Sequence, residues 1–147
     1  MKKFLPPTHF FTYLIISVLL HYIVPIAQII NYPYNWLGFL FFLLGGILNI
    51  WPDQLFKKLK TTVKPDEKPS LLIQTGPFKI SRNPMYLGMA LLLIGVGIVL
   101  GSVTSFIGFI FFILAMEISF IPQEEKILTE QFGDEYELYK KKVRRWI

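Results

Sequence analysis

The chain has 147 residues, a formal net charge of +5 and no cysteine. This length suits one domain, and a chain without cysteine has no disulfide, thiolate metal ligand, cysteine nucleophile or S-acylation site. The mean hydropathy of +0.49 is too high for a soluble domain of this size. The sequence therefore predicts a small integral membrane protein, with residues 1–147 forming a single membrane domain.

Two long stretches, Phe4–Pro52 and Asn83–Met116, contain no Asp, Glu, Lys or Arg. A membrane-spanning helix needs about 20 apolar residues, and a short one about 17. Each stretch is long enough for two spans, so an all-α bundle of about four transmembrane helices is expected. The expected spans are residues 9–30, with a kink at Pro25, and residues 36–51, 84–100 and 103–121.

The N-terminus partly imitates a signal peptide, because Lys2 and Lys3 precede an apolar run. The run is longer than a signal-peptide core, and no cleavage site of the Ala-x-Ala type follows it. We therefore expect this segment to be a retained span.

The charged residues are expected on one side of the membrane. All 15 Lys and Arg residues lie before the first span, in the polar segment 53–82 or in the tail 122–147. The two other connections, 31–35 and 101–102, carry no charge, and the acidic residues follow the same division, with Glu117 near the boundary. The positive-inside rule places both termini and segment 53–82 in the cytoplasm. This pattern favours the lipid surface over nucleic acid as the partner.

The tail 122–147 predicts two helices. Pro122 starts or kinks the first helix, whose first turn holds Glu124 and Glu125, and Gly133 is expected as its C-cap. Residues 134–145 predict a basic amphipathic helix that lies in the membrane interface. The two glutamates fit either simple complementation of the helix dipole or binding of hydroxyl and amino donors from a ligand.

The strongest local site signal lies just before the third span. Asn83 followed by Pro84 predicts a helix start, with Asn83 as N-cap and Pro84 at the first helical position. Arg82 would then lie beside the positive end of the helix dipole, where a bound carboxylate finds free N–H groups and a guanidinium. The alternative is a capped span with a snorkelling arginine and an interfacial Tyr86.

Two further signals are weaker. His21 is expected deep in the first span, where it is either functional or a neutral residue bonded to a neighbouring helix. Gly95, Gly97 and Gly101 favour close helix packing over a nucleotide-binding loop. The sequence contains no zinc-ligand spacing, hydrolytic triad or P-loop, so no metal is expected.

Taken together, the segments before the third span and after the fourth resemble the superfamily of isoprenylcysteine carboxyl methyltransferases and phospholipid methyltransferases. The resemblance covers roughly residues 69–147 and rests on Gly76-Pro77-Phe78, Arg82-Asn83-Pro84-Met85-Tyr86, Glu124-Glu125, Leu128, Phe132-Gly133, Tyr136, Tyr139 and Val143-x-Arg145-Trp146. Asn83 stands where many members have His. Phe120 stands where the eukaryotic prenylcysteine enzymes have a substrate-contacting Arg.

The resemblance implies that S-adenosylmethionine binds at the cytosolic membrane face without a Rossmann domain. It implies Arg82 and Glu124 as catalytic residues. The implied cofactor-binding residues are Ser70, Leu71, Leu72, Ile73, Phe78, Asn83, Pro84, Met85, Tyr86, Glu124 and Glu125. The implied reaction methylates a membrane-embedded, lipid-like or isoprenylated acceptor, by carboxyl O-methylation or amine N-methylation.

Two rival functions stay open. A small four-helix transporter would need a buried ionisable coupling group, for which His21 is the candidate. A non-catalytic membrane scaffold would bind anionic lipid through the basic helix in the tail, and it would not need Arg82 or Glu124.

Overall fold

The computed structural model describes residues 5–61 and 69–147, so Lys2, Lys3 and the centre of the polar segment around Pro65 lie outside the described residues. The described part folds as helices: α1 (Pro6–Ile23), α2 (Gly38–Leu59), α3 (Pro84–Leu100), α4 (Ile107–Ala115), α5 (Ile121–Phe132) and α6 (Asp134–Lys142). A π-helical turn, Met116–Phe120, joins α4 and α5 into one continuous helix. The predicted all-α class is confirmed.

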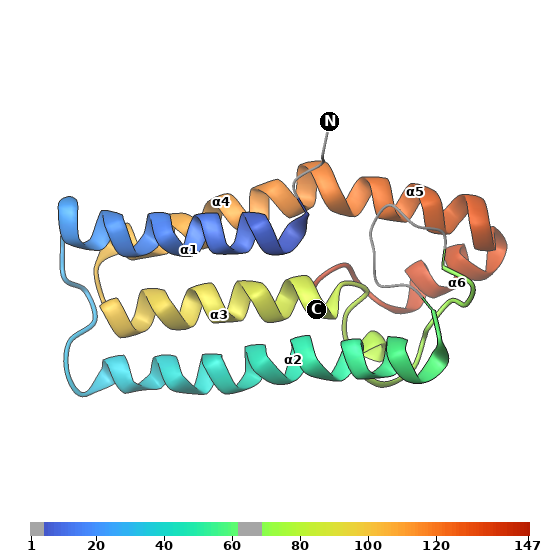
Figure 1. Ribbon diagram of the computed structural model, residues 1–147, viewed down its shortest axis with the longest axis horizontal. Coiled ribbons are helices and arrows are strands. Elements are labelled where there is room, and N and C mark those ends of the chain that lie inside the picture. The colour runs from blue at the N-terminus through green and yellow to red at the C-terminus, as the bar shows by residue number, and fades with distance from the viewer. Residues whose placement is uncertain (1–4, 62–68) are drawn as a thin grey trace.

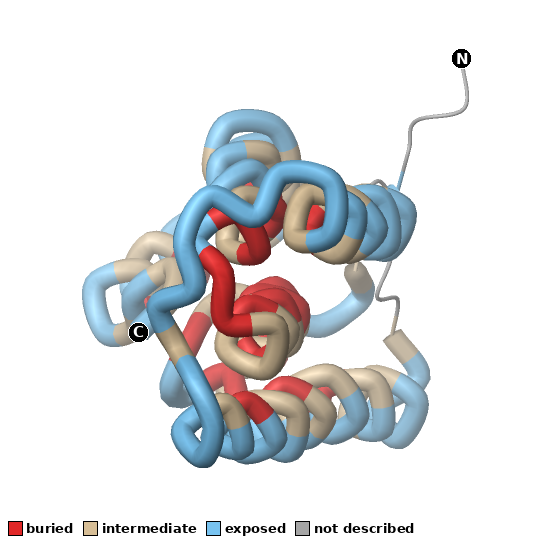
Figure 2. The backbone as a smooth tube through the Cα atoms, turned by 90° about the vertical axis from the view of Figure 1, so that its left-hand side faces the viewer, coloured by how far each residue is buried: buried red, intermediate tan, exposed pale blue. Residues whose placement is uncertain are grey.

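Helix α3 forms the centre of the bundle. It lies between α2 on one side and the pair α1 and α4 on the other (Figure 1). Viewed along the bundle, the buried residues gather on this central helix (Figure 2). The main core joins α3 to the α4–α5 helix through Tyr86, Met89, Ala90, Leu93, Phe112, Met116 and Ile121. The centre of the bundle is thus apolar along most of its length.

Helices α2 and α3 approach closely because glycines meet at their crossing. A Cβ atom on Gly45 would lie 2.7 Å from the carbonyl oxygen of Gly88, and one on Gly88 would lie 2.4 Å from Nδ2 of Asn49. Such contacts are too short for a side chain, so glycine is required here for backbone contact between the helices. Of the glycines that were predicted to serve helix packing, Gly95 does so against α2, because a Cβ atom there would lie 2.9 Å from the carbonyl oxygen of Gly38.

The outer faces of the helices are strongly apolar. The large hydrophobic side chains that stay exposed include Phe11, Ile15, Leu19, Leu40, Leu43, Ile47, Ile50, Ile110, Phe111 and Leu114. An aqueous surface of this composition would aggregate, whereas a bilayer solvates it. Within residues 5–61 and 69–147, the helices Tyr34–Leu59 and Val103–Phe132 are long and apolar enough to cross a membrane, and Pro84–Leu100 is a shorter apolar helix. The total of four spans stays a prediction.

The first span was predicted too long. Helix α1 ends at Ile23, and Val24 leaves helical geometry with φ −134° and ψ 64°. Pro25 explains this, because a proline ring disfavours helical geometry in the preceding residue and the proline lacks an N–H donor. The helix therefore stops instead of kinking, and residues 24–30 form part of a turn.

The connections 24–37 and 101–106 close one end of the bundle. The N–H of Ile29 donates to the carbonyl of Gly101 at 2.8 Å, and the N–H of Val103 donates to the carbonyl of Ala27 at 2.9 Å. Gly101 ends α3 with a positive φ of 76°, a backbone geometry that favours glycine. We call this end the uncharged end.

The opposite end gathers the charges of the described residues. The start of α1, the end of α2, the start of α3 and the pair α5 and α6 all lie there (Figure 1). The charged residues of the described ranges fall in 53–60, 79–82 and 117–145. We call this the charged end, and its assignment to the cytoplasm stays a prediction.

Candidate active site

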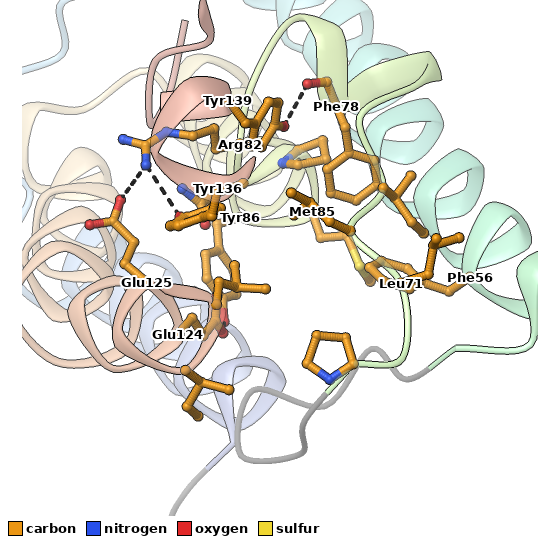
Figure 3. Close-up of a pocket in the computed structure, with 17 residues that line it drawn as sticks. Phe56, Leu71, Phe78, Arg82, Met85, Tyr86, Glu124, Glu125, Tyr136 and Tyr139 are labelled. Carbon is orange, nitrogen blue, oxygen red and sulfur yellow. Dashed lines mark hydrogen bonds and ion pairs between the residues drawn. The ribbon is translucent and has the colours of Figure 1, made fainter. Parts of the chain in front are cut away.

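A cavity of about 150 Å³ opens at the charged end, between the end of α2, the start of α3, α5 and α6 (Figure 3). Its wall comprises Phe56, Pro69, Leu71, Leu72, Ile73, Phe78, Arg82, Asn83, Pro84, Met85, Tyr86, Glu124, Glu125, Ile127, Leu128, Tyr136 and Tyr139. Segments that are far apart in sequence therefore meet around one space. Most of the wall is apolar, and a few polar groups converge on it, as in small-molecule sites.

The cavity brings together all but one of the residues predicted to bind a cofactor. The exception is Ser70, which is exposed and donates its backbone N–H to the Thr61 hydroxyl at 3.2 Å. The wall residues that were not predicted are Phe56, Pro69, Ile127, Leu128, Tyr136 and Tyr139. Helical spacing could have indicated Ile127 and Leu128, because they follow Glu124 by three and four residues and share its helix face.

Glu124 faces Tyr86 across the cavity wall. The Tyr86 hydroxyl, in the first turn of α3, donates a short hydrogen bond to the Glu124 carboxylate. Burial raises the pKa of Glu124 to about 7, the nearby Glu125 adds to the rise, and the bond from Tyr86 opposes it. Glu124 lies beyond the expected fourth span. A carboxyl group that changes charge near neutral pH inside a cavity is typical of a functional site.

Arg82 is fixed on the same wall by two polar partners. Its Nη1 lies 2.8 Å from Oε1 of Glu125 and 3.2 Å from the Tyr136 hydroxyl (Figure 3). The Arg82 side chain is only 10% exposed. Its Nε is buried without a hydrogen-bond partner among the residues that the structure describes. One donor of a buried cation in the cavity wall is thus left for an acceptor that residues 5–61 and 69–147 do not supply.

Asn83 occupies the predicted N-cap position of α3, but its side chain makes no capping bond within the described part of the chain. Its Nδ2 instead donates to the carbonyl of Arg145 at 3.0 Å. Ser81 donates to the same carbonyl at 2.9 Å. The predicted capping role of the Asn83 side chain is wrong, because the C-terminal segment packs against this turn and takes its donors.

Helix α6 contributes two tyrosines to the cavity wall. Tyr136 and Tyr139 are 1% and 4% exposed and pack with Ile73 and Phe78. The Tyr139 hydroxyl donates to the carbonyl of Phe78 at 2.6 Å. Burial raises the pKa of Tyr136 to about 12, so its hydroxyl stays protonated at neutral pH. The helix predicted to lie in the membrane interface is shorter than expected and turns its tyrosines toward the protein.

His21 belongs to the other end of the bundle. It was expected deep in the first span, but it lies in the last turn of α1 because that helix ends at Ile23. Its Nδ1 lies 2.9 Å from the hydroxyl oxygen of Ser102. This bond agrees with the second alternative for His21, a histidine bonded to a neighbouring segment. The position of His21 near the helix end removes the argument for a coupling group at the membrane midplane.

Comparison with known proteins identifies the family of this chain. The family model for phospholipid methyltransferases matches residues 33–135. The chain belongs to the phospholipid methyltransferase family. Membership in this family indicates a membrane methyltransferase, and the match spans both sides of the cavity, from α2 to the start of α6.

Two relatives share part of this sequence. An uncharacterized protein of Haemophilus influenzae is 44% identical over 63 residues, which are 43% of this chain and all of that protein. The protein-S-isoprenylcysteine O-methyltransferase of Saccharomyces cerevisiae is 39% identical over 77 residues, which are 52% of this chain and 32% of that enzyme. This phospholipid methyltransferase family member thus matches only about a third of the length of the yeast enzyme.

Proposed function

We propose that this protein methylates a membrane-embedded, lipid-like acceptor and takes the methyl group from S-adenosylmethionine. The observation that carries the proposal is the meeting of Arg82, the start of α3 and Glu124 around one largely apolar cavity. Membership in the phospholipid methyltransferase family supports the reaction class. The cofactor and the acceptor are parts of the proposal.

The cavity suits the cofactor on three grounds. The unpartnered Nε of Arg82 and the N-terminal end of α3 would receive its carboxylate. The Glu124 carboxylate would accept hydrogen bonds from its hydroxyl or amino groups. The apolar side chains Leu71, Ile73 and Phe78 would surround its base. The wall residues thus supply a cation, an anion and an apolar surface for the three chemically different parts of one molecule.

When bound, S-adenosylmethionine supplies a methyl group on a positively charged sulfur, and the C–S bond breaks as the acceptor bonds the methyl. The protein therefore mainly has to align donor and acceptor and exclude water. The buried tyrosines of α6 form part of the cavity wall and would help to exclude water. A lipid-like acceptor would arrive from the apolar side of the bundle, and the polar donor from the charged end.

Binding and product analysis test the proposal. Detergent-purified protein should bind S-adenosylmethionine in calorimetry, and Glu124→Ala should weaken that binding at least about tenfold, because a hydrogen bond to a charged group contributes about 1.5–3 kcal/mol. Wild-type protein that binds no S-adenosylmethionine would falsify the idea.

The acceptor is found by mass spectrometry of membrane lipids, as species that gain one CH₂ when the protein is present. Mild alkali then separates the two chemistries, because it cleaves a methyl ester and leaves an N-methyl group intact. Lipids that show no such gain would count against a lipid-like acceptor.

A further inference from the structure

A chain of four charged groups runs from the cavity wall to the C-terminal segment. Arg82 pairs with Glu125 at 2.8 Å. Arg145 holds both oxygens of the same Glu125, through Nε at 2.9 Å and Nη2 at 2.7 Å. The remaining Nη1 of Arg145 donates to Glu117. Two cations and two anions thus balance one another at the edge of the proposed cofactor site.

This network raises a difficulty for the proposed function, on which the present inference rests. The cation expected to receive the cofactor's carboxylate already has a carboxylate partner, Glu125. Glu125 is only 15% exposed, and a buried charge that loses its partner is strongly destabilising. A carboxylate bound at Nε of Arg82 would compete with Glu125, which pairs with Nη1, for the charge of one guanidinium. If Arg82 were its sole partner, Glu125 would lose part of the charge that stabilises it.

The bidentate grip of Arg145 resolves the difficulty. Glu125 keeps two charged hydrogen bonds to Arg145 when Arg82 turns to a ligand. Bonds to Glu125 and Glu117 raise the pKa of Arg145 above its ordinary value, so the guanidinium stays charged. We propose that Arg145 is a positioning residue that holds Glu125 in place and thereby releases Arg82 to bind the carboxylate of the methyl donor.

The backbone around Arg145 is anchored independently of its side chain. The carbonyl of Arg145 accepts bonds from Ser81 and Asn83. The carbonyl of Arg144 accepts from the N–H of Arg82 at 3.0 Å, and the Trp146 indole donates to Glu117 at 3.0 Å. A side-chain change at Arg145 is therefore expected to leave the C-terminal segment in its place.

The test compares two ligands that differ in one group, S-adenosylmethionine and its decarboxylated analogue. Calorimetry with Arg145→Gln should show an affinity for S-adenosylmethionine that is lowered about tenfold, because Glu125 then competes for Arg82. The affinity for the decarboxylated analogue should change less than about twofold, since that ligand makes no demand on Arg82.

Three further variants sharpen the result. Arg144→Gln is the matched control, because Arg144 is the neighbouring residue, carries the same charge and is exposed; it should leave both affinities unchanged. Arg145→Lys keeps the charge but not the bidentate geometry, so it should fall between wild type and Arg145→Gln. In a Glu125→Gln background, Arg145→Gln should have no further effect on the affinity, since the anion that pairs with Arg82 is gone.

The outcomes separate the inference from the proposed function. Equal weakening for both ligands, or no weakening for either, overturns the role of Arg145 while cofactor binding stands. Wild type that binds neither ligand overturns the proposed function and this inference with it. If a thermal melt shows that Arg145→Gln is unfolded, Arg145→Lys and the variants in the Glu125→Gln background decide instead. The quantity compared is again the ratio of the affinities for S-adenosylmethionine and its decarboxylated analogue.

Discussion

The two ends of the bundle are built from the same helices but closed by different chemistry. At the uncharged end, backbone bonds between residues 24–30 and 101–103 join the turns, and His21 bonds a serine hydroxyl. At the charged end, Arg82, Glu125 and two buried tyrosines line a cavity, and Arg145 pairs with Glu125. The uncharged end leaves one buried acceptor, Oδ1 of Asn35, without a partner in the described part of the chain. At the charged end, the buried group without such a partner is a donor of a cation, Nε of Arg82, and Arg82 lies in the wall of a cavity, which is what a binding site for an anionic group requires.

The largest expected effect comes from removing the cation at the charged end. Arg82→Ala should lower the affinity for S-adenosylmethionine about 100-fold, because charged hydrogen bonds of about 1.5–3 kcal/mol each are lost with the carboxylate. The variant should fold, since Glu125 keeps Arg145 as a partner. Calorimetry checks the affinity, and a thermal melt checks the fold. Unchanged affinity in a folded variant would exclude Arg82 from the site.

The glycine crossing lies between the two ends and separates stability from binding. Gly45→Ala should lower the free energy of unfolding by about 1–3 kcal/mol, because its Cβ would overlap the carbonyl oxygen of Gly88. Gly46→Ala is the matched control, since a Cβ at Gly46 meets nothing within 4 Å. Denaturation in detergent measures both. Equal loss in the two variants would mean that the close approach of α2 and α3 does not matter for stability.

A pH titration tests Glu124 directly. If its anion binds the ligand, affinity should rise about tenfold between pH 6 and pH 8 and then level off, since the pKa of the carboxyl is about 7. The sign for folding is opposite. The folded pKa lies above the ordinary 4.5, so ionisation of Glu124 lowers the stability of the free protein as pH rises from about 4.5 to 7. Calorimetry across pH should show a flat profile for Glu124→Gln, and a slope that persists there points to another group.

The smallest effect is expected at the uncharged end. His21→Ala should cost about 1 kcal/mol of stability through the lost bond to Ser102, and it should leave ligand affinity and methyl transfer unchanged. A flux assay in liposomes provides the contrasting measurement. Substrate flux in wild type that disappears in His21→Ala would revive the transporter hypothesis.

Helix boundaries that depend on residues close in sequence could be predicted from local signals. Asn83-Pro84 and Gly101 mark the two ends of α3, which runs from Pro84 to Leu100 as predicted. The prediction at Pro25 was wrong, because a proline can either kink a helix or end it. Here the helix ends, and the residues that follow bond to the connection 101–103. Glu124 and Arg82 were identified as candidates from their places at helix starts.

Long-range partners could not be predicted from local patterns. The grip of Arg145 on Glu125 joins residues 20 positions apart, and the Tyr139 bond to Phe78 joins residues 61 apart. Nothing in the spacing of the tail indicates that α6 folds back over the cavity. The helix predicted over 134–145 as basic ends at Lys142 and carries as many acidic as basic residues, and its place in the membrane interface stays a prediction.

The π-helical turn at Met116–Phe120 has a consequence for insertions and deletions. A π-turn holds one residue more than the α-helical turn it replaces. If this stretch kept all its residues but formed a regular α-helix, everything after it would rotate by about 100°, since an α-helix advances 3.6 residues per turn. Glu124 and Glu125 would then face away from Tyr86 and Arg82. Deleting one residue in the π-turn should instead leave an α-helical turn with the two glutamates still facing the cavity, so related chains are expected to tolerate the loss of one residue here.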